Sequence, residues 1–239
     1  MPADHVLPDR LRAVLAVLYL VFNEGYSPSG DADGLVRVDL CEEAIRLARL
    51  LAVLMPDEPE ALGLLALMLH QDARRDARTG AGGELVLLED QDRSLWHAGR
   101  IAEAGRVLER ASAHRLPGPY QLQAAIAAVH ASAATAAETD WALMASLYAR
   151  LAVIAPSPLV ELNRAVAIAM ADGPESGLAV VDAIDGLDGY RLFHAARADL
   201  LRRAGRPHEA EPAYRRALEL TPNAVERRFL ERRLAELWL

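Results

Sequence analysis

The sequence predicts an all-α protein built from stacked helical hairpins. Ala and Leu dominate the 239 residues and aromatic side chains make up only 5%, a composition that favours helices. Apolar residues recur every three or four positions along most of the chain, as on the buried face of a helix. Proline marks four turns that lead directly into helical runs, at Pro59, Pro119, Pro158 and Pro222. Proline suits the first turn of a helix, and its recurrence at roughly 30–60 residues is typical of repeat proteins.

The amino-terminal part is expected to hold three helices, at about residues 8–22, 35–54 and 58–71. Residues 23–31 contain two glycines and a proline, which should break the first helix. In the second and third helices the apolar positions step by three or four residues, so one face of each is expected to be buried.

Helical periodicity stops in the middle of the chain, over residues 72–93. This stretch is rich in glycine and ends in a cluster of helix-capping residues, and the helical pattern resumes at about residues 94–114. A loop of this length inside a helical array is usually functional or packs back over the helices. We therefore expect an inserted loop with one of these two roles.

The remaining chain is predicted to form helices at about residues 120–133, 141–154, 159–171, 175–184, 190–204, 207–220 and 224–238. The hairpin over residues 190–220 fits the tetratricopeptide pattern through Ala198, Gly205, Ala210, Tyr214, Ala217 and Pro222. Small residues let the two helices cross closely, and the tyrosine fills the gap to the next repeat. We expect a single tetratricopeptide-like domain over residues 1–239, a right-handed superhelix of about five hairpins plus a C-terminal capping helix.

Charge limits the classes of partner. The net charge is −8, which argues against nucleic-acid binding because phosphate contacts need clustered cations. All 26 basic residues are arginines, and residues 191–239 hold 11 of them against 7 acidic residues. We interpret these arginines as members of helix-surface ion pairs, such as Arg227 with Glu231, rather than as a surface for an acidic partner.

The single cysteine and the lack of targeting signals favour the cytoplasm. Cys41 cannot form an intrachain disulfide, which favours a reducing compartment, and the acidic residues beside it should raise the thiol pKa. The chain shows no secretory signal and no run of 18 apolar residues, so we expect neither export nor a membrane contact.

Several segments together make the chain similar to a known family, namely residues 15–27, 40–51, 87–94, 118–130, 161–167 and 226–230. The most specific of them contain Asn23-Glu24-Gly25-Tyr26 and Asp90-Gln91-Asp92-Arg93-Ser94. On these residues the chain resembles the C-terminal tetratricopeptide-like extension of extracytoplasmic-function (ECF) RNA polymerase sigma factors.

The resemblance implies a bacterial, cytoplasmic regulatory domain that acts in transcription initiation. Its implied partners are sigma regions 2 and 4 or core RNA polymerase, with no direct contact between this chain and nucleic acid. Regions 2 and 4 do not fit before residue 8, so the chain is either an excised domain or a stand-alone relative. An activating and an inhibitory role both stay open, as does the oligomeric state.

Two candidate partner-binding segments carry these motifs. Asn23, Glu24 and Tyr26 form either a recognition loop or a helix end that has Gly25 in a left-handed conformation.

The second segment comprises Asp90, Gln91, Asp92, Arg93 and Trp96. It binds a partner or a cation, or it is a capped turn. In the capped turn Asp92 or Ser94 caps the following helix and Arg93 pairs locally.

Four further polar residues lie in otherwise apolar helices: Gln121, Glu161, Asn163 and Arg164. They either face a peptide on the concave surface of the array or form a buried polar network between hairpins.

The sequence offers no signal for catalysis. The seven histidines do not show metal-ligand spacing, and no serine elbow, phosphate-binding glycine loop or Cys–His signature is present. We expect no catalytic residue, no metal and no cofactor. The alternatives to a sigma-factor domain are a stand-alone protein- or peptide-binding module and a small-molecule sensor, in which residues 72–93 fold over a pocket.

Overall fold

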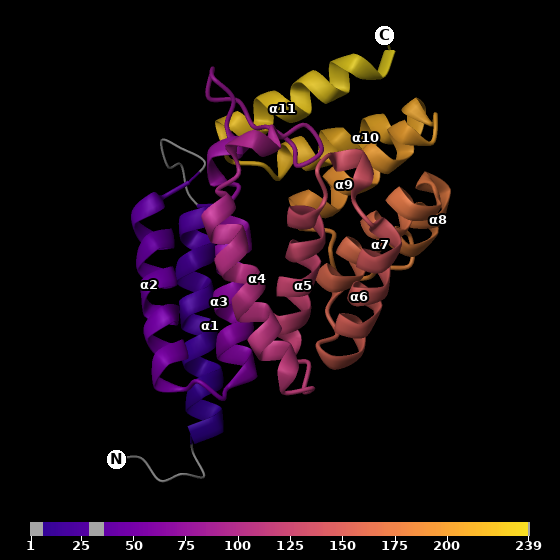
Figure 1. The fold of residues 1–239 in the computed structure, drawn as a ribbon. Coiled ribbons are helices and arrows are strands. Elements are labelled where there is room, and N and C mark those ends of the chain that lie inside the picture. Colours follow the sequence, from indigo (N-terminus) through magenta and orange to yellow (C-terminus); the bar gives the residue numbers. More distant parts are fainter. Residues whose placement is uncertain (1–6, 29–35, 239) are drawn as a thin grey trace. The chain divides into compact units, whose positions relative to one another are not determined.

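The computed structural model describes the backbone of residues 7–28 and 36–238 and side chains from residue 9 onward within those ranges. The α-helices of this part of the chain are α1 (Leu7–Tyr26), α2 (Val38–Leu54), α3 (Pro59–Asp72), α4 (Ala98–Ala113), α5 (Pro119–Ser132), α6 (Trp141–Ile154), α7 (Pro158–Asp172), α8 (Pro174–Val181), α9 (Arg191–Arg203), α10 (Pro207–Glu219) and α11 (Ala224–Ala235) (Figure 1). The expected all-α fold of helical hairpins is confirmed.

Short 3-10 helices join or extend some of these elements: η2 (Arg75–Arg78), η3 (Arg93–Leu95), η4 (Ala136–Glu138) and η5 (Glu236–Trp238). Contacts between Cα atoms divide the chain into two compact units. The first unit contains residues 1–79 and 86–134, and the second contains residues 80–85 and 135–239. The single domain expected from the sequence stays a prediction.

In the first unit, α3 is the central helix. It packs against α1, α2, α4 and α5, and every residue from Ala61 to His70 is buried. A helix that is apolar on all sides belongs in a core, because no side of it gains from contact with water. Gly63 permits the close approach of α5, since a Cβ atom there would lie 2.7 Å from the backbone nitrogen of Gln121.

The end of α1 differs from the sequence expectation. The helix continues through Tyr26, so residues 23–26 form its last turn, and the rest of the expected break lies largely outside the described residues. The expected left-handed Gly25 is wrong, because Gly25 is helical. A Cβ atom at Gly25 would lie 2.8 Å from both the backbone nitrogen and the Sγ atom of Cys41, so glycine serves the close contact of α1 with α2.

The start of α4 also differs. The helix begins at Ala98, and only the 3-10 turn η3 forms where the helix was expected to resume. The Nδ1 atom of His97 accepts a hydrogen bond from the backbone nitrogen of Arg100 at 3.2 Å and caps α4. The expected hairpin of residues 120–133 with 141–154 is distributed over the two units, with α5 in the first and α6 in the second.

The second unit stacks its helices in chain order, each against the next, from α6 to α11. Its core contains Ala198, Ala210, Tyr214 and Ala217 from the predicted repeat. Gly205 ends that repeat's first helix in the left-handed region, with φ of +70°. The repeat is therefore built from the residues that predicted it.

Ion pairs neutralise much of the basic surface of the second unit. Arg227 lies 3.9 Å from Glu231, as predicted, and Arg191 lies 3.0 Å from Glu226. Similar pairs join Arg197 to Asp182, Arg202 and Arg203 to Asp199, Arg206 to Glu209 and Glu175, Arg215 to Glu211, and Arg216 to Glu219. The interpretation of these arginines as members of helix-surface pairs is confirmed.

Candidate functional site

The segment between α3 and α4 binds the C-terminal ends of three helices in the first unit. The Arg78 guanidinium donates to the carbonyl oxygen of Tyr26 at the end of α1. The Arg93 guanidinium donates to the carbonyl oxygens of His130 and Ala133 at the end of α5. The backbone nitrogen of His97 donates to the carbonyl oxygen of Ala73, directly after α3, at 2.7 Å.

The last carbonyls of a helix lack partners within the helix and carry partial negative charge, so guanidinium groups bind them well. We call Tyr26, Arg74, Arg78, Arg93 and Trp96 the helix-end cluster. Its two parts meet, because η2, which carries Arg78, contacts η3, which carries Arg93.

Tyr26 anchors the first part of the helix-end cluster. Its ring stacks on Phe22 with the centroids 5.7 Å apart. The guanidinium carbon of Arg78 lies 4.0 Å from the Tyr26 ring centroid and that of Arg74 lies 5.8 Å from it, both in cation–π contact. Tyr26 thus holds η2 against α1.

Asn23 and Glu24 lie in the same turn of α1 and are half-buried. Burial raises the pKa of Tyr19, and a hydrogen bond with the Asn23 side chain acts in the opposite direction. Asn23 therefore contacts its own helix, one turn back.

Arg93 and Trp96 anchor the second part of the cluster. The guanidinium carbon of Arg93 lies 4.8 Å from the centroid of the buried Trp96 ring. Gln91 is also buried, and its amide donates to the carbonyl oxygen of Val86 at 3.4 Å. Besides this local contact with Trp96, the Arg93 guanidinium reaches carbonyl oxygens in α5 and in the residue just after it, which the sequence did not indicate.

Asp92 is a capping residue, as expected, but it caps a different element. Its carboxylate accepts a hydrogen bond from the backbone nitrogen of Ser94 at 2.9 Å, so it caps η3 and not α4. Hydrogen bonding with Ser94 lowers the pKa of the Asp92 carboxyl. Asp90 and Asp92 both stay exposed.

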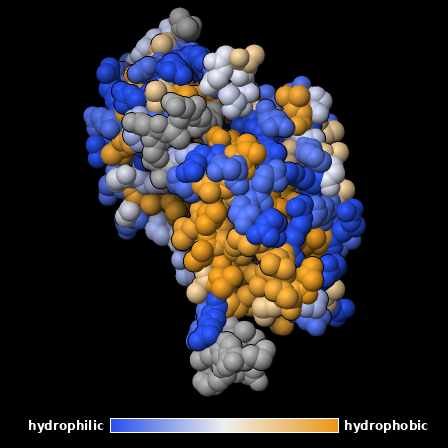
Figure 2. All heavy atoms as spheres, turned by 90° about the vertical axis from the view of Figure 1, so that its left-hand side faces the viewer, coloured by the Kyte–Doolittle hydropathy of each residue, from blue (hydrophilic) through white to orange (hydrophobic). Residues whose placement is uncertain are grey.

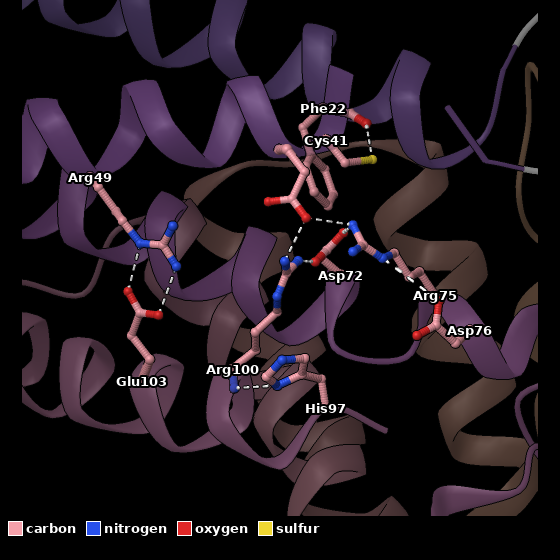
Figure 3. Close-up of polar contacts among 10 residues, drawn as sticks. Phe22, Cys41, Arg49, Asp72, Arg75, Asp76, His97, Arg100 and Glu103 are labelled. Atoms are coloured by element: carbon pink, nitrogen blue, oxygen red, sulfur yellow. Dashed lines mark hydrogen bonds and ion pairs between the residues drawn. The ribbon is translucent and has the colours of Figure 1, made fainter. Parts of the chain in front are cut away.

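A buried ion network lies next to this cluster (Figure 3). The Asp72 side chain is fully buried and forms ion pairs with Arg75, at 3.2 Å, and with Arg100. Both arginines also bind Glu42, at 2.9 and 2.6 Å. The network joins α2, α3, η2 and α4 and balances two cations with two carboxylates, as buried charges require.

The network shifts the pKa values of its neighbours. Burial acts to raise the pKa of Glu42, but hydrogen bonds from Arg100 and Arg75 outweigh it and lower the pKa. Burial raises the pKa of the Cys41 thiol to about 11, opposed by Arg75 and assisted by Glu42. The expected unreactive character of Cys41 thus has burial as its main cause.

Gln121 lies at the opposite end of α5 in a polar network between helices. The Glu60 carboxylate accepts hydrogen bonds from the backbone nitrogens of Tyr120, at 2.9 Å, and Gln121, at 3.1 Å, and so caps α5 from α3. The buried Gln121 side chain donates to Glu60 at 3.2 Å and to the carbonyl oxygen of Leu116 at 2.8 Å. Of the two alternatives for Gln121, the structure shows the buried network.

In the second unit, Glu161 and Arg164 form an ion pair at 2.7 Å on α7. They line a shallow pocket of about 640 Å³, together with Pro156, Ser157, Pro158, Ala179, Val180, Ala183, Ile184 and Asp185. Asn163 is exposed and is not among the lining residues. The lining is thus mostly apolar, with the ion pair, Ser157 and Asp185 as its polar groups.

The structure therefore brings the two motif segments of the first unit together and leaves the other candidates apart from them. Sequence reasoning missed Glu60, Asp72, Arg75, Arg78 and Arg100. Apart from Asp72 and Arg75, which are three residues apart, they bind partners on segments distant in the sequence, and no spacing along the chain could have indicated those pairs.

Within the described residues, no group of three or more His, Cys, Asp or Glu side chains is placed to hold a metal ion. None of the described helices combines the length and the apolar character that crossing a membrane requires.

Comparisons with known proteins match two separate parts of the chain. Residues 10–112 match a family described as "Family of unknown function (DUF6596)", and residues 192–224 match the tetratricopeptide repeat. The repeat covers nearly all of α9 and α10. The chain thus carries a helical repeat of the class that serves protein–protein contacts.

The chain is also similar to a longer protein. It is 50% identical over 230 residues to the uncharacterized protein R00370 of Rhizobium meliloti (strain 1021), which covers 96% of this chain and 54% of the relative. The chain thus spans about half the length of that relative. No solved structure matches.

Proposed function

We propose that this chain is a regulatory domain of an ECF sigma factor. It controls transcription initiation through contacts with sigma regions 2 and 4 or with core RNA polymerase. The observation that carries the proposal is the convergence of the two motifs most specific for that resemblance. Residues 23–26 and 90–94 lie far apart in the sequence, yet η2 and η3 bring them together in the helix-end cluster.

The cluster supports a surface suited to a protein partner. Asp90, Asp92 and Leu95 are exposed on the turn that Arg93 and Trp96 hold in place. Two carboxylates beside an exposed apolar side chain fit a basic protein surface with an apolar centre. Because the turn is held before binding, little conformational entropy is lost when a partner docks.

The comparisons are compatible with such an assembly but do not name it. None of the matches reported above names a sigma factor. Nearly half of the longer relative lies outside the match, as expected if this domain forms one part of a larger protein. The tetratricopeptide repeat adds a second element of the kind used for protein contacts.

Binding measurements test the proposal. The purified chain is titrated with the region 2–region 4 fragment of a sigma factor that carries such an extension, and with core RNA polymerase. We expect binding to at least one of them, weakened about tenfold or more by Leu95→Asp. Leu116→Asp changes another exposed leucine of the same unit and is the matched control.

Absence of binding to both partners would refute the proposal. If binding is found, competition with promoter DNA shows whether the domain inhibits or activates transcription initiation. A promoter that displaces the domain indicates inhibition, and a promoter that binds more tightly in its presence indicates activation.

The pocket in the second unit favours a second candidate function, a stand-alone peptide-binding module or small-molecule sensor. Glu161 and Arg164 would orient a polar group of the ligand over the apolar lining. Thermal stabilisation by peptides or metabolites, lost in the Glu161→Ala/Arg164→Ala double variant, would support this candidate. Equal stabilisation of the double variant would place binding elsewhere.

A further inference from the structure

The amino-terminal helix α1 has an apolar face that the other described residues of the first unit leave exposed. All residues from 13 to 22 are apolar. Leu15 and Phe22 point into the core, whereas Val17 is 58% and Leu20 is 66% exposed. A helix with apolar residues on all sides gains stability only when both sides are covered. The outer side of α1 is therefore a candidate contact surface.

The uncovered side forms one continuous stripe along the helix. It comprises the exposed residues Arg10, Ala13, Val14, Val17 and Leu20, which share one face of the helix, and it ends at the half-buried Val21 and Glu24. The apolar part has a cation at its N-terminal end and a carboxylate at its C-terminal end. Val17 lies at the midpoint, with seven residues to each charged end.

The neighbouring helix extends this apolar surface. Leu50, Val53 and Leu54 are exposed at the C-terminal end of α2. The contact between Gly25 and Cys41 places the end of α1 beside the start of α2, so the C-terminal end of α2 lies beside the first half of α1. Figure 2 shows the apolar side chains gathered on this face.

We propose that a second copy of this chain covers the stripe and that the two α1 helices pack antiparallel about a twofold axis at Val17. In that arrangement Arg10 faces the partner's Glu24, Val14 faces the partner's Leu20, and Val17 faces the partner's Val17. A twofold interface requires such self-complementarity, in which each contact occurs twice.

The charges select this arrangement over a parallel one. Parallel packing would place the two Arg10 side chains together and the two Glu24 side chains together, which is unfavourable. Antiparallel packing pairs opposite charges at both ends and also aligns the helix dipoles favourably. The inference does not rest on the proposed function, because none of the side chains of the helix-end cluster belongs to the stripe; the two proposals share only the motif residue Glu24.

Sedimentation of the full chain tests the proposal. At about 100 µM, where a dimer with a micromolar Kd is nearly fully formed, we expect wild type to sediment as a dimer. Val17→Glu places two carboxylates against each other at the axis and should raise the dimer Kd about 30-fold or more. Val153→Glu makes the same change at a valine that is 81% exposed on α6, and it should stay dimeric.

A charge exchange tests the direction of packing. Arg10→Glu and Glu24→Arg should each raise the Kd about tenfold, because each places like charges together twice per dimer. The variant with both changes restores both ion pairs and should recover wild-type association. Thermal melting of each variant confirms folding, which matters because Glu24 also interacts within its own chain.

The outcomes separate clearly. A monomeric wild type, or a Val17→Glu variant that dimerises as tightly as wild type, overturns the proposal. A folded double variant that stays as weak as the single ones overturns the antiparallel pairing.

Discussion

His70 is expected to make the stability of the first unit depend on pH. It lies on the central helix α3 and is only 5% exposed. Within the described residues, neither of its ring nitrogens has a hydrogen-bond partner. Burial lowers the His70 pKa from 6.5 to about 4, because the charged imidazolium would lose its hydration in the core.

The sign and size of the effect follow from this shift. Between pH 6.5 and 4 the unfolded chain binds a proton at His70 that the folded chain does not bind, so the free energy of unfolding decreases as the pH falls. Each pH unit in this window removes about 1.4 kcal/mol, and the whole shift corresponds to about 3 kcal/mol. Above pH 6.5 this contribution to stability is fully retained.

Urea unfolding followed by circular dichroism at several pH values between 4.5 and 7 measures the effect. His70→Leu should reduce the pH slope of the unfolding free energy by about 1.4 kcal/mol per pH unit. His114→Gln changes an exposed histidine and controls for the loss of an imidazole. Comparing variants at each pH cancels the titration of the carboxylates. A His70→Leu variant with the wild-type pH slope would refute the reasoning.

Three further predictions concern the packing of the first unit. Gly25→Ala places a Cβ atom 2.8 Å from the backbone of Cys41 and should cost about 1–3 kcal/mol in urea unfolding. In the control Gly105→Ala, inside α4, the added Cβ atom meets nothing within 4 Å and should stabilise the unit by about 0.5–1 kcal/mol. Equal effects of the two substitutions would contradict the close contact between Gly25 and Cys41. Arg93→Met removes the guanidinium that binds the end of α5 and should lower the unfolding free energy by about 1–3 kcal/mol, whereas an unchanged value would show that these bonds do not stabilise the unit. Cys41 should react with a thiol reagent only in denaturant, and rapid labelling of the native chain would disprove its burial.

The sequence predicted the helices well because helical periodicity is a local property. The tetratricopeptide hairpin was found from six positions, and α6 was predicted with its observed limits. Local signals failed where tertiary contacts decide the outcome. In the sequence Gly25 resembles a residue that ends a helix. In the structure it lies inside α1, where the lack of a side chain makes room for Cys41.

The candidate site was predicted only in part, for the same reason. The motif residues were identified, and Asp92 does cap a turn. The carbonyl partners of Arg93 lie about 40 residues further along the chain, and Asp72 and Arg100 come into contact only when the chain folds. Periodicity and spacing carry no information about such pairs, so arginines that bind helix ends look like ordinary surface residues.

The dependence of α3 on α5 has a practical consequence for fragments of this protein. The family match ends at residue 112, inside α4, yet α5 covers one side of the central helix and supplies the N–H groups that bind Glu60. A fragment cut at residue 112 would expose that side of α3 to water and leave the Glu60 carboxylate without those donors. The compact unit therefore extends to residue 134, about one helix beyond the end of the family match, and a fragment of this unit should include α5.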